Sequence, residues 1–426
     1  MPIRLLAIGD MHLGRPASRL PESLARHAHE YTPIIAWERT VSLAIQRQVD
    51  LVVIAGDLVD QEEQLFEAYR PLEMGINRLV EKGITVLGVS GNHDVYVLPR
   101  LADQLSAFRL LGANGLWETY VHKKSGEEVT IHGWSFPRAV VDESPLSGHV
   151  FERGPGFNIG LLHCDLDQSA SRYAPVSSAA LRATGLDAWL LGHVHVPSEL
   201  SKDNCFGYLG SLCGLHIGEH GRRGPWLLEI NNGRLQELTQ WQVAPLAWEQ
   251  VTLDASKIES PSHAINHLLT ELKKCEVTWS KADESPLAAG IRVRLQGETN
   301  CASQICDMLL EQQNNNLGVG QTQHIFIESV IDETKVALDL HELAKQTDHL
   351  GHLARYLLLL EEPESNPERS ALIEEAWEHL GAHAKDPRWQ LLHAETIDQE
   401  TIIRYLKTSG HQLLRELQAQ REEHSG

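Results

Sequence analysis

The sequence has few of the features that mark secreted or membrane proteins. Its six cysteines are scattered without a CxxC pair or a disulfide-like rhythm, which argues against a thiolate metal site and suits a reducing compartment. No apolar run reaches the roughly 18 residues of a membrane span. The first residues lack the apolar core and the small-residue cleavage site of a signal peptide. We therefore expect a cytoplasmic protein with no membrane partner.

Positive charge is also scarce. With 37 Lys and Arg against 58 Asp and Glu, the formal net charge is −21. A bulk charge of this sign repels a polyanion, so any contact with nucleic acid has to be local. Histidine, in contrast, is abundant at 23 residues. Because imidazole is a common metal ligand and a common acid or base near neutral pH, the positions of the histidines are informative.

The chain of 426 residues is longer than a typical single domain, so we expect more than one. Over residues 1–245, short apolar runs alternate with segments of helical period, which predicts an α/β layered fold. The predicted strands are Ile3–Ile8, Leu51–Ala55, Thr85–Val89, Val129–Trp134, Asn158–Leu162 and Ala188–Leu191. One predicted helix begins at Pro33 with Thr32 as its cap. A second predicted helix carries on one face Leu65, Tyr69, Leu72, Ile76 and Leu79.

Two further regions follow. Residues 246–338 are expected to form a small α/β domain, with strands at 250–253, 291–295 and 325–330 and helices at 262–274 and 302–311. Residues 339–426 are predicted to be helical, and from His341 onward they hold 16 acidic against 9 basic residues. This last segment is either a solvated appendage or a docking surface for a partner helix.

Five short polar clusters each follow a predicted strand of the first region. They are Asp10 with His12, Gly56-Asp57-x-x-Asp60, Gly91-Asn92-His93-Asp94, His163, and Gly192-His193-Val194-His195. Because the carboxyl ends of strands in an α/β sheet meet at one crevice, we expect these side chains to meet. Each cluster alone is weak, since a single His after a strand is more often a core residue. Together they indicate a metal site.

The ligand types limit the metal. Two Asp, one Asn and four His are too rich in nitrogen for Mg²⁺ or Ca²⁺, and the lack of thiolates disfavours structural zinc. Mn²⁺, Fe²⁺ and catalytic Zn²⁺ remain. Seven ligands are too many for one such ion and suit two ions bridged by a carboxylate, for which Asp57 is the candidate. Such centres hydrolyse phosphate esters.

At this point the sequence resembles a known family. The segments DMHLG, GDLVD, GNHD, LLH and GHVH, in this order, resemble the calcineurin-like metallophosphoesterases. His12-Leu13-Gly14, the long spacing to His163 and the segment YLGSLCGLHIGEHGRRGPWLLEI are similar to DNA repair nucleases of SbcD type, most closely to their YhaO-like branch. The resemblance covers about residues 1–235. It implies a two-sheet sandwich flanked by helices over 1–245, a small α/β capping domain at 246–338 and a helical C-terminal segment at 339–426.

The resemblance also implies roles for residues. One metal ion, most simply Mn²⁺, is held by Asp10, His12, Asp57 and His195, and the second by Asp57, Asn92, His163 and His193. His93 lies beside the scissile phosphate, where it either protonates the leaving oxygen or stabilises the developing charge. Asp60 occupies the position from which relatives orient that histidine by a hydrogen bond.

Other residues near these motifs are less specific. The candidate substrate contacts are Arg15, Arg100 and Arg222, with surface charges or structural ion pairs as the alternative for each. His216 and His220 match no ligand position, and Leu215 stands where relatives often carry Arg. The side chains expected in the core are Trp134, Trp189 and Trp226.

The function implied by the resemblance is a Mn²⁺-dependent DNA nuclease that works with an SMC-like ATPase subunit. Weak homodimerisation through the helix near 65–80 is implied as well. One alternative is a small-molecule phosphoesterase, which the acidic net charge favours. Another is a scaffold without catalysis, which is disfavoured because no ligand position is substituted.

Overall fold

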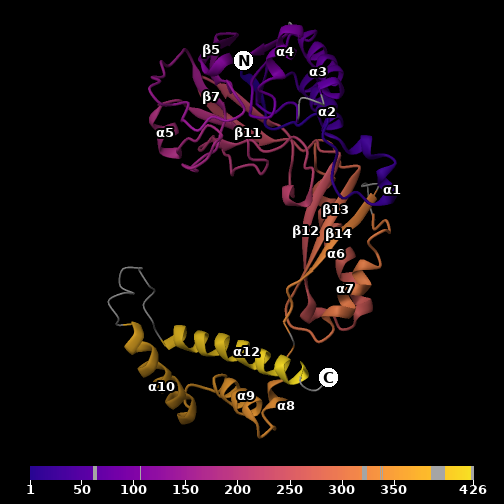
Figure 1. The fold of residues 1–426 in the computed structure, drawn as a ribbon, viewed down its shortest axis with the longest axis vertical. Helices are drawn as coiled ribbons and strands as arrows, with labels where there is room; N and C mark the ends of the chain where they lie inside the picture. Colours follow the sequence, from indigo (N-terminus) through magenta and orange to yellow (C-terminus); the bar gives the residue numbers. More distant parts are fainter. Residues whose placement is uncertain are drawn as a thin grey trace. The chain divides into compact units, whose positions relative to one another are not determined.

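The computed structural model describes residues 1–60, 65–105, 107–318, 324–335, 337, 339–384 and 399–423. The chain divides into two compact units. The first unit contains Met1–Leu295 and Ser303–Asp332, and the second contains Gln296–Ala302 and Glu333–Gly426. Figure 1 shows the elements of both units along the chain.

The first unit is built on two large sheets. The six-stranded sheet has the order β11 (Arg234–Gln240), β10 (Trp226–Asn231), β1 (Ile3–Ile8), β2 (Leu51–Ala55), β3 (Thr85–Val89) and β4 (Phe108–Leu110). The five-stranded sheet has the order β5 (Trp117–Lys124), β6 (Glu127–Trp134), β7 (Phe157–His163), β8 (Ala188–Gly192) and β9 (Phe206–Tyr208). Strands β1 to β4 run parallel, and so do β6 to β9. The carboxyl ends of the parallel strands in each sheet therefore lie on one edge.

The two sheets pack face to face. Alternate residues of β1, β2 and β3, such as Leu5, Val53 and Val89, share a buried core with residues of β6, β7 and β8, such as Ile131 and Leu161. Apart from Arg4 and Thr85, the residues of the predicted strands are buried on both faces, which explains their almost continuous apolar runs. The fold class expected from the sequence, a two-sheet α/β sandwich flanked by helices, is confirmed.

Helices cover the outer faces. The six-stranded sheet packs against α2 (Pro33–Gln46), α3 (Leu65–Val80) and α4 (Leu98–Gln104), and α5 (Ser178–Ala183) packs against the five-stranded sheet. The short helix α1 (Glu22–Ala25) precedes α2. Pro33 opens α2 as predicted, but the Thr32 hydroxyl does not cap it. That hydroxyl donates to the His29 carbonyl of the preceding 3₁₀ turn at 3.0 Å.

Helix α3 has two faces of different character. Leu72, Ile76 and Leu79 are buried as predicted, whereas Phe66 and Met74 on the other side are 87% and 56% exposed. Dimerisation through this helix stays a prediction.

A third sheet contains β12 (Leu246–Asp254), β13 (Ala288–Gln296) and β14 (His324–Asp332). One of its faces packs against α6 (Ala264–Trp279) and α7 (Ala302–Leu310) around a separate apolar core that includes Val251, Leu268 and Ile291 (Figure 1). The opposite face contributes Trp248 and Phe326 to a small apolar cluster with Leu24, Tyr31 and Ile217. Leu24 lies in α1, and Tyr31 and Ile217 lie in 3₁₀ turns of the segments that connect the sandwich strands, so the third sheet is anchored to those connecting segments.

The second unit is helical. Its elements are α8 (Leu340–Leu343), α9 (His349–Leu359), α10 (Pro367–Ala384) and α12 (Gln399–Glu423), which share an apolar core. Among the residues that the structure describes, no helix combines the length and the apolarity needed to cross a membrane.

Candidate metal centre

Tight turns at the ends of β1 and β2 bring the first two motifs together. Gly56 and Asp57 both adopt left-handed backbone angles, with φ of 94° and 49°. A Cβ atom on Gly56 would lie 2.7 Å from Nδ1 of His163, so only glycine fits there. The Asp57 carbonyl accepts hydrogen bonds from the backbone N–H groups of Met11 and His12, each at 3.0 Å. The two turns therefore hold each other in place.

The first group of candidate ligands comprises Asp10, His12 and His195, which each offer an atom within 4.8 Å of the other two. Asp10 is anchored because its carboxylate accepts the backbone N–H of His193 at 3.0 and 3.1 Å. The Nε2 atoms of His12 and His195 face each other at 2.9 Å.

The other ring nitrogens of these two histidines explain this approach. Nδ1 of His12 lies 2.8 Å from the Asp60 carboxylate, and Nδ1 of His195 lies 2.8 Å from the Glu219 carboxylate. In His195 the hydrogen bond with Glu219 fixes the proton on Nδ1, and in His12 the charge of the nearby Asp60 carboxylate favours the proton on the same nitrogen. In the neutral rings both Nε2 atoms then present lone pairs to the same point. Two facing lone pairs repel unless a cation lies between them. The first group therefore suits a metal ion.

The second group lies on the other side of Asp57. Nε2 of His163 is 3.0 Å from Oδ1 of Asn92, 3.2 Å from Nδ1 of His193 and 3.3 Å from Oδ2 of Asp57. Nδ1 of His163 faces the carbonyl of Ala55 at 3.0 Å, and Nε2 of His193 faces Asp165 at 3.3 Å. These outer contacts place the ring protons of both histidines away from the centre. Four acceptor atoms then converge: Nε2 of His163, Nδ1 of His193, Oδ1 of Asn92 and Oδ2 of Asp57.

Asp57 lies between the two groups. Its Oδ2 is 3.3 Å from Nε2 of His163 and 3.9 Å from Nε2 of His12, and the side chain is 2% exposed. Burial raises the pKa of Asp57, but the nearby imidazoles, His163 first, outweigh burial and leave that pKa below its usual value. The structure thus brings together all seven side chains that the sequence analysis selected as metal ligands, and their donor types fit two divalent ions of the Mn²⁺, Fe²⁺ or Zn²⁺ kind.

His93 lies beside the first group. Its backbone N–H donates to Oδ1 of Asp57 at 3.1 Å, and its ring stands edge-on to His12 with the centroids 5.2 Å apart. Nδ1 of His93 contacts the backbone carbonyl of Asp60 at 2.8 Å. The side chain is exposed, which leaves Nε2 as the nitrogen free to exchange a proton with a bound molecule.

The contact between Asp60 and His93 differs from the expected one. It comes from the Asp60 main chain, whereas the Asp60 carboxylate contacts His12 and lies 3.3 Å from Nη1 of Arg15. Burial raises the pKa of Asp60, but its contact with His12 lowers that pKa below the usual value. The Asp60 carboxylate contacts His12 because the turn after β2, which is bridged to Leu13 through Val59, directs the side chain towards the His12 loop.

Sequence reasoning missed one residue, Glu219. It is 3% exposed, contacts Nδ1 of His195 and accepts hydrogen bonds from the Ser211 hydroxyl and the Leu215 N–H, each at 3.1 Å. The hydrogen bond to Glu219 raises the pKa of His195 above its usual value, although burial acts against it. A clue was available, because Glu219 lies inside the histidine-rich HIGEHG segment.

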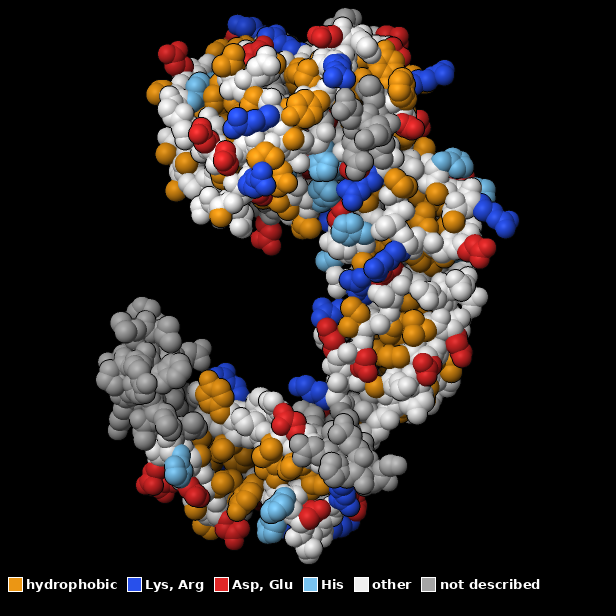
Figure 2. Space-filling model, in the orientation of Figure 1, with side chains coloured by type: hydrophobic (Ala, Val, Ile, Leu, Met, Phe, Trp, Pro, Cys, Tyr) orange, Lys and Arg blue, Asp and Glu red, His pale blue; other side chains and the backbone are white. Residues whose placement is uncertain are grey.

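The remaining candidates are surface residues and residues of the Glu219 loop. Arg100 is on α4 and Arg222 is in the loop after Glu219, and both are exposed. His216 contacts Glu219 at 3.1 Å and is half-exposed. Leu215 is buried, so its side chain is not a substrate contact. Figure 2 shows histidine and basic side chains gathered on the visible face of the first unit.

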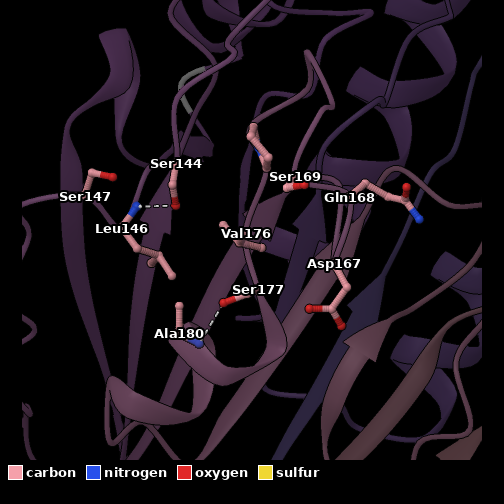
Figure 3. Close-up of a pocket in the computed structure, with 10 residues that line it drawn as sticks. Ser144, Leu146, Ser147, Asp167, Gln168, Ser169, Val176, Ser177 and Ala180 are labelled. Carbon is pink, nitrogen blue, oxygen red and sulfur yellow. Dashed lines mark hydrogen bonds between the residues drawn. The ribbon is translucent and has the colours of Figure 1, made fainter. Parts of the chain in front are cut away.

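A separate hollow of about 600 Å³ lies beside α5. Figure 3 shows Ser144, Ser147 and Ser169 around it, with the Asp167 carboxylate at one side. Asp167 accepts the backbone N–H of Ser178 at 2.8 Å. Among the described residues no basic side chain lines this hollow, so those residues do not suit a phosphate group.

The aromatic side chains expected in the core, Trp134, Trp189 and Trp226, are at most 8% exposed, which confirms that prediction. Among the cysteines, Cys164, Cys205 and Cys213 are buried and the other three are partly buried, and all six are free thiols.

Comparison with known proteins gives one family match and several similar proteins. Residues 3–197 match the family described as calcineurin-like phosphoesterase. The chain is 26% identical over 299 residues to YhaO of Bacillus subtilis, an uncharacterized metallophosphoesterase, covering 68% of this chain and 70% of that protein. It is 25% identical over 257 residues to the DNA double-strand break repair protein Mre11 of Methanopyrus kandleri, covering 55% of this chain and 56% of that protein. A solved dimetal phosphatase from Danio rerio matches 57% of this chain and all of its own, with 13% identity and a TM-score of 0.36.

Proposed function

Because residues 3–197 match the calcineurin-like phosphoesterase family, we propose that this protein is a metal-dependent DNA nuclease that hydrolyses phosphodiester bonds. The observation that carries the proposal is the convergence of two groups of lone pairs on either side of Asp57. The related Mre11 protein is a DNA double-strand break repair protein, which supports DNA as the substrate class.

Different residues have different proposed roles in hydrolysis. Two divalent ions held by these residues, proposed to be Mn²⁺, would supply Lewis-acid polarisation of the phosphoryl group and an activated water. Asp60 and Glu219 fix the rings of His12 and His195, and Asp10 fixes the turn at His193. With Nδ1 held by the Asp60 carbonyl, His93 protonates the leaving oxygen through Nε2.

DNA contact has to overcome a net charge of −21. Arg15, which is 39% exposed and lies within 3.3 Å of Asp60, and the exposed Arg222 are the proposed phosphate contacts. Both lie in loops that carry residues of the centre, so positive charge is concentrated where the reaction takes place.

The test is degradation of end-labelled linear duplex and single-stranded DNA with Mn²⁺, with Mg²⁺ or with EDTA. We expect metal-dependent cleavage by the unmodified chain and its loss in Asp57→Asn and in His93→Ala. His149→Ala, a histidine that stacks on Trp117 outside the centre, is the matched control and should cleave normally. Absence of cleavage under every condition would contradict the nuclease proposal.

A small-molecule phosphoesterase is the second candidate, because a strongly acidic chain is poorly suited to a polyanion. Hydrolysis of bis-p-nitrophenyl phosphate without cleavage of either DNA would favour this candidate. That result would support the metal centre and would replace DNA by a small phosphoester as the proposed substrate.

The proposal extends to a partner, an SMC-like ATPase subunit. An apolar groove of about 420 Å³ in the second unit is lined by residues of α9, α10 and α12, among them Tyr356, Tyr405 and Leu413. These three side chains are 53%, 49% and 48% exposed. The excess of acidic residues from His341 onward suits an amphipathic helix with basic residues along its edges. Leu413→Glu should abolish binding to the ATPase subunit in a pull-down of purified proteins, while a Leu310→Glu control should bind normally.

A further inference from the structure

We propose that Glu219 is a positioning residue for the metal ligand His195, and that Trp248 of β12 holds Glu219 in place. The third sheet then sets the geometry of the metal centre. This inference rests on the proposed function, since it requires that His195 binds a metal ion.

Both carboxylate oxygens of Glu219 contact polar neighbours, which restrains the side chain. One oxygen, Oε1, lies 2.8 Å from Nδ1 of His195 and 3.1 Å from Nε2 of His216. The other oxygen accepts from the Ser211 hydroxyl and from the Leu215 N–H. Because both oxygens are engaged and the side chain is buried, the carboxylate can orient the His195 ring and keep its proton on Nδ1.

Trp248 fixes the loop that carries Glu219. Its indole N–H donates to the Gly214 carbonyl at 3.0 Å, and its own carbonyl accepts the N–H of Gly221 at 2.9 Å. One residue of β12 is therefore bonded to both ends of the loop 214–221. Ile217, in the middle of that loop, belongs to the same apolar cluster as Trp248.

The other two strands of the third sheet fix Trp248 in turn. The indole is 1% exposed and lies against Gly290 of β13, where a Cβ atom would come within 2.3 Å of the ring. Phe326 of β14 packs edge-on, with ring centroids 6.0 Å apart. A shift of the third sheet would therefore move the loop 214–221 through its two hydrogen bonds to Trp248. The loop would in turn move His195 through the Glu219 carboxylate.

The experiment measures Mn²⁺ affinity of the full-length, metal-free protein by isothermal titration calorimetry. We expect Glu219→Gln to weaken Mn²⁺ binding by about 10- to 100-fold, as for other residues that hold a histidine ligand. Ser211→Ala and Trp248→Phe each remove one hydrogen bond of the chain of contacts, so we expect about 2- to 10-fold weaker binding. Glu219→Asp keeps the charge and should bind better than Glu219→Gln.

Matched controls come from the helix-covered side of the same sheet. Glu249 is a partly buried carboxylate of β12, and Trp279 is a buried indole of α6 in the core around Leu268. Glu249→Gln and Trp279→Phe should retain the Mn²⁺ affinity of the unmodified chain, even where they lower thermal stability.

The outcomes separate the two proposals. If the unmodified chain binds no Mn²⁺, the proposed function fails. If it binds Mn²⁺ and the folded Glu219→Gln and Ser211→Ala variants bind equally well, the positioning role of Glu219 is overturned. If Trp279→Phe weakens binding as much as Trp248→Phe does, the specific role of Trp248 is overturned. Ser211→Ala removes only a hydroxyl and is expected to fold. It therefore still tests the positioning role of Glu219 if Trp248→Phe fails to fold.

Discussion

Charge is distributed unequally among the buried carboxylates of the centre. Asp10, Asp57 and Asp94 are at most 2% exposed, and three buried negative charges without partners would be costly. Burial and the charge of Asp57 raise the pKa of Asp94 well above its usual value, while it accepts hydrogen bonds from Leu58 and Gly91. The pKa of Asp57, in contrast, is lowered by imidazoles. The negative charge therefore stays on the carboxylate that lies between the two ligand groups.

The Asp60 side chain gives the first prediction at this scale. Asp60→Asn keeps the main-chain carbonyl that contacts His93 but removes the charge beside His12. We expect Mn²⁺ affinity to fall about 10- to 100-fold, measured by calorimetry. Unchanged Mn²⁺ affinity with a large loss of turnover would contradict this account, because it would mean that the carboxylate acts on His93.

Individual residues also show how far the sequence could predict the site. Its seven candidate ligands could be found because each follows an apolar strand, and strand ends converge. For Glu219 the histidine-rich HIGEHG segment gave a weaker clue, because no strand directly precedes this residue and its loop is placed by Trp248, about 30 residues further on. The direction of the Asp60 side chain depends on a bridge between Leu13 and Val59, which local sequence does not reveal.

At the scale of elements, the third sheet is joined to the sandwich by packing and by ions. Arg19, in the loop after His12, lies 2.7 Å from Oε1 of Glu328 in β14, and Arg292 of β13 lies 3.2 Å from its Oε2. Burial raises the pKa of Glu328, but its hydrogen bond with Ser329 and its ion pairs lower it below the usual value. Its stabilising contribution is therefore present above its unfolded pKa and is lost as the pH falls through the folded pKa.

Glu328→Gln should lower stability at neutral pH, since it leaves two arginines without their carboxylate. We expect a loss of about 1 to 3 kcal/mol in the free energy of unfolding, measured with urea. Acidification to about pH 4 should destabilise the variant less than the unmodified chain, because the titrating group is gone. If acidification lowered the free energy of unfolding equally in the variant and in the unmodified chain, Glu328 would make no contribution to acid sensitivity.

Gly290 offers a prediction for the contact between β13 and β12. In Gly290→Ala the added Cβ would meet the Trp248 ring at 2.3 Å, so the indole has to move. We expect a loss of about 1 to 3 kcal/mol in unfolding free energy, together with altered tryptophan fluorescence. Gly233→Ala, at a site where a Cβ meets nothing within 4 Å, is the steric control, although its φ of 65° costs some stability. Unchanged fluorescence in Gly290→Ala would contradict the close packing described.

The elements themselves were predicted unevenly. All six expected strands of the first region are present, because long buried runs such as Leu51–Ala55 have a clear pattern. Strands β4 and β9 were missed since each has only three residues. Strands β5, β10 and β11 were also missed, and exposed β11 is ordered by its pairing with β10. Short strands are stabilised by their neighbours and carry little pattern of their own.

At the scale of the whole molecule, net charge and local charge have opposite signs. The chain carries −21, whereas the proposed contacts around the centre are arginines and two bound cations. Binding to DNA should therefore weaken as the salt concentration rises, with a shallow slope set by the small number of phosphate contacts. The domain division at 245 and 338 stays a prediction, since the contacts of Trp248 and Glu328 join the third sheet to the sandwich.

Arg222 tests this electrostatic account. Arg222→Ala should weaken DNA binding and reduce the slope of log affinity against log salt by about one. Fluorescence anisotropy at several salt concentrations provides the slope. Arg234→Ala, an exposed arginine at the outer edge strand β11, should leave the slope as it is. Equal changes in both variants would mean that DNA does not bind near the centre.

The most direct measurement is the anomalous diffraction of crystals of the full chain grown with Mn²⁺. The account predicts two anomalous peaks on either side of Asp57, about 3.5 to 4 Å apart. One peak should be bounded by Asp10, His12 and His195, and the other by Asn92, His163 and His193. A single peak, or a peak at the alternative cluster of His12, Asp60 and His93, would contradict the two-metal centre.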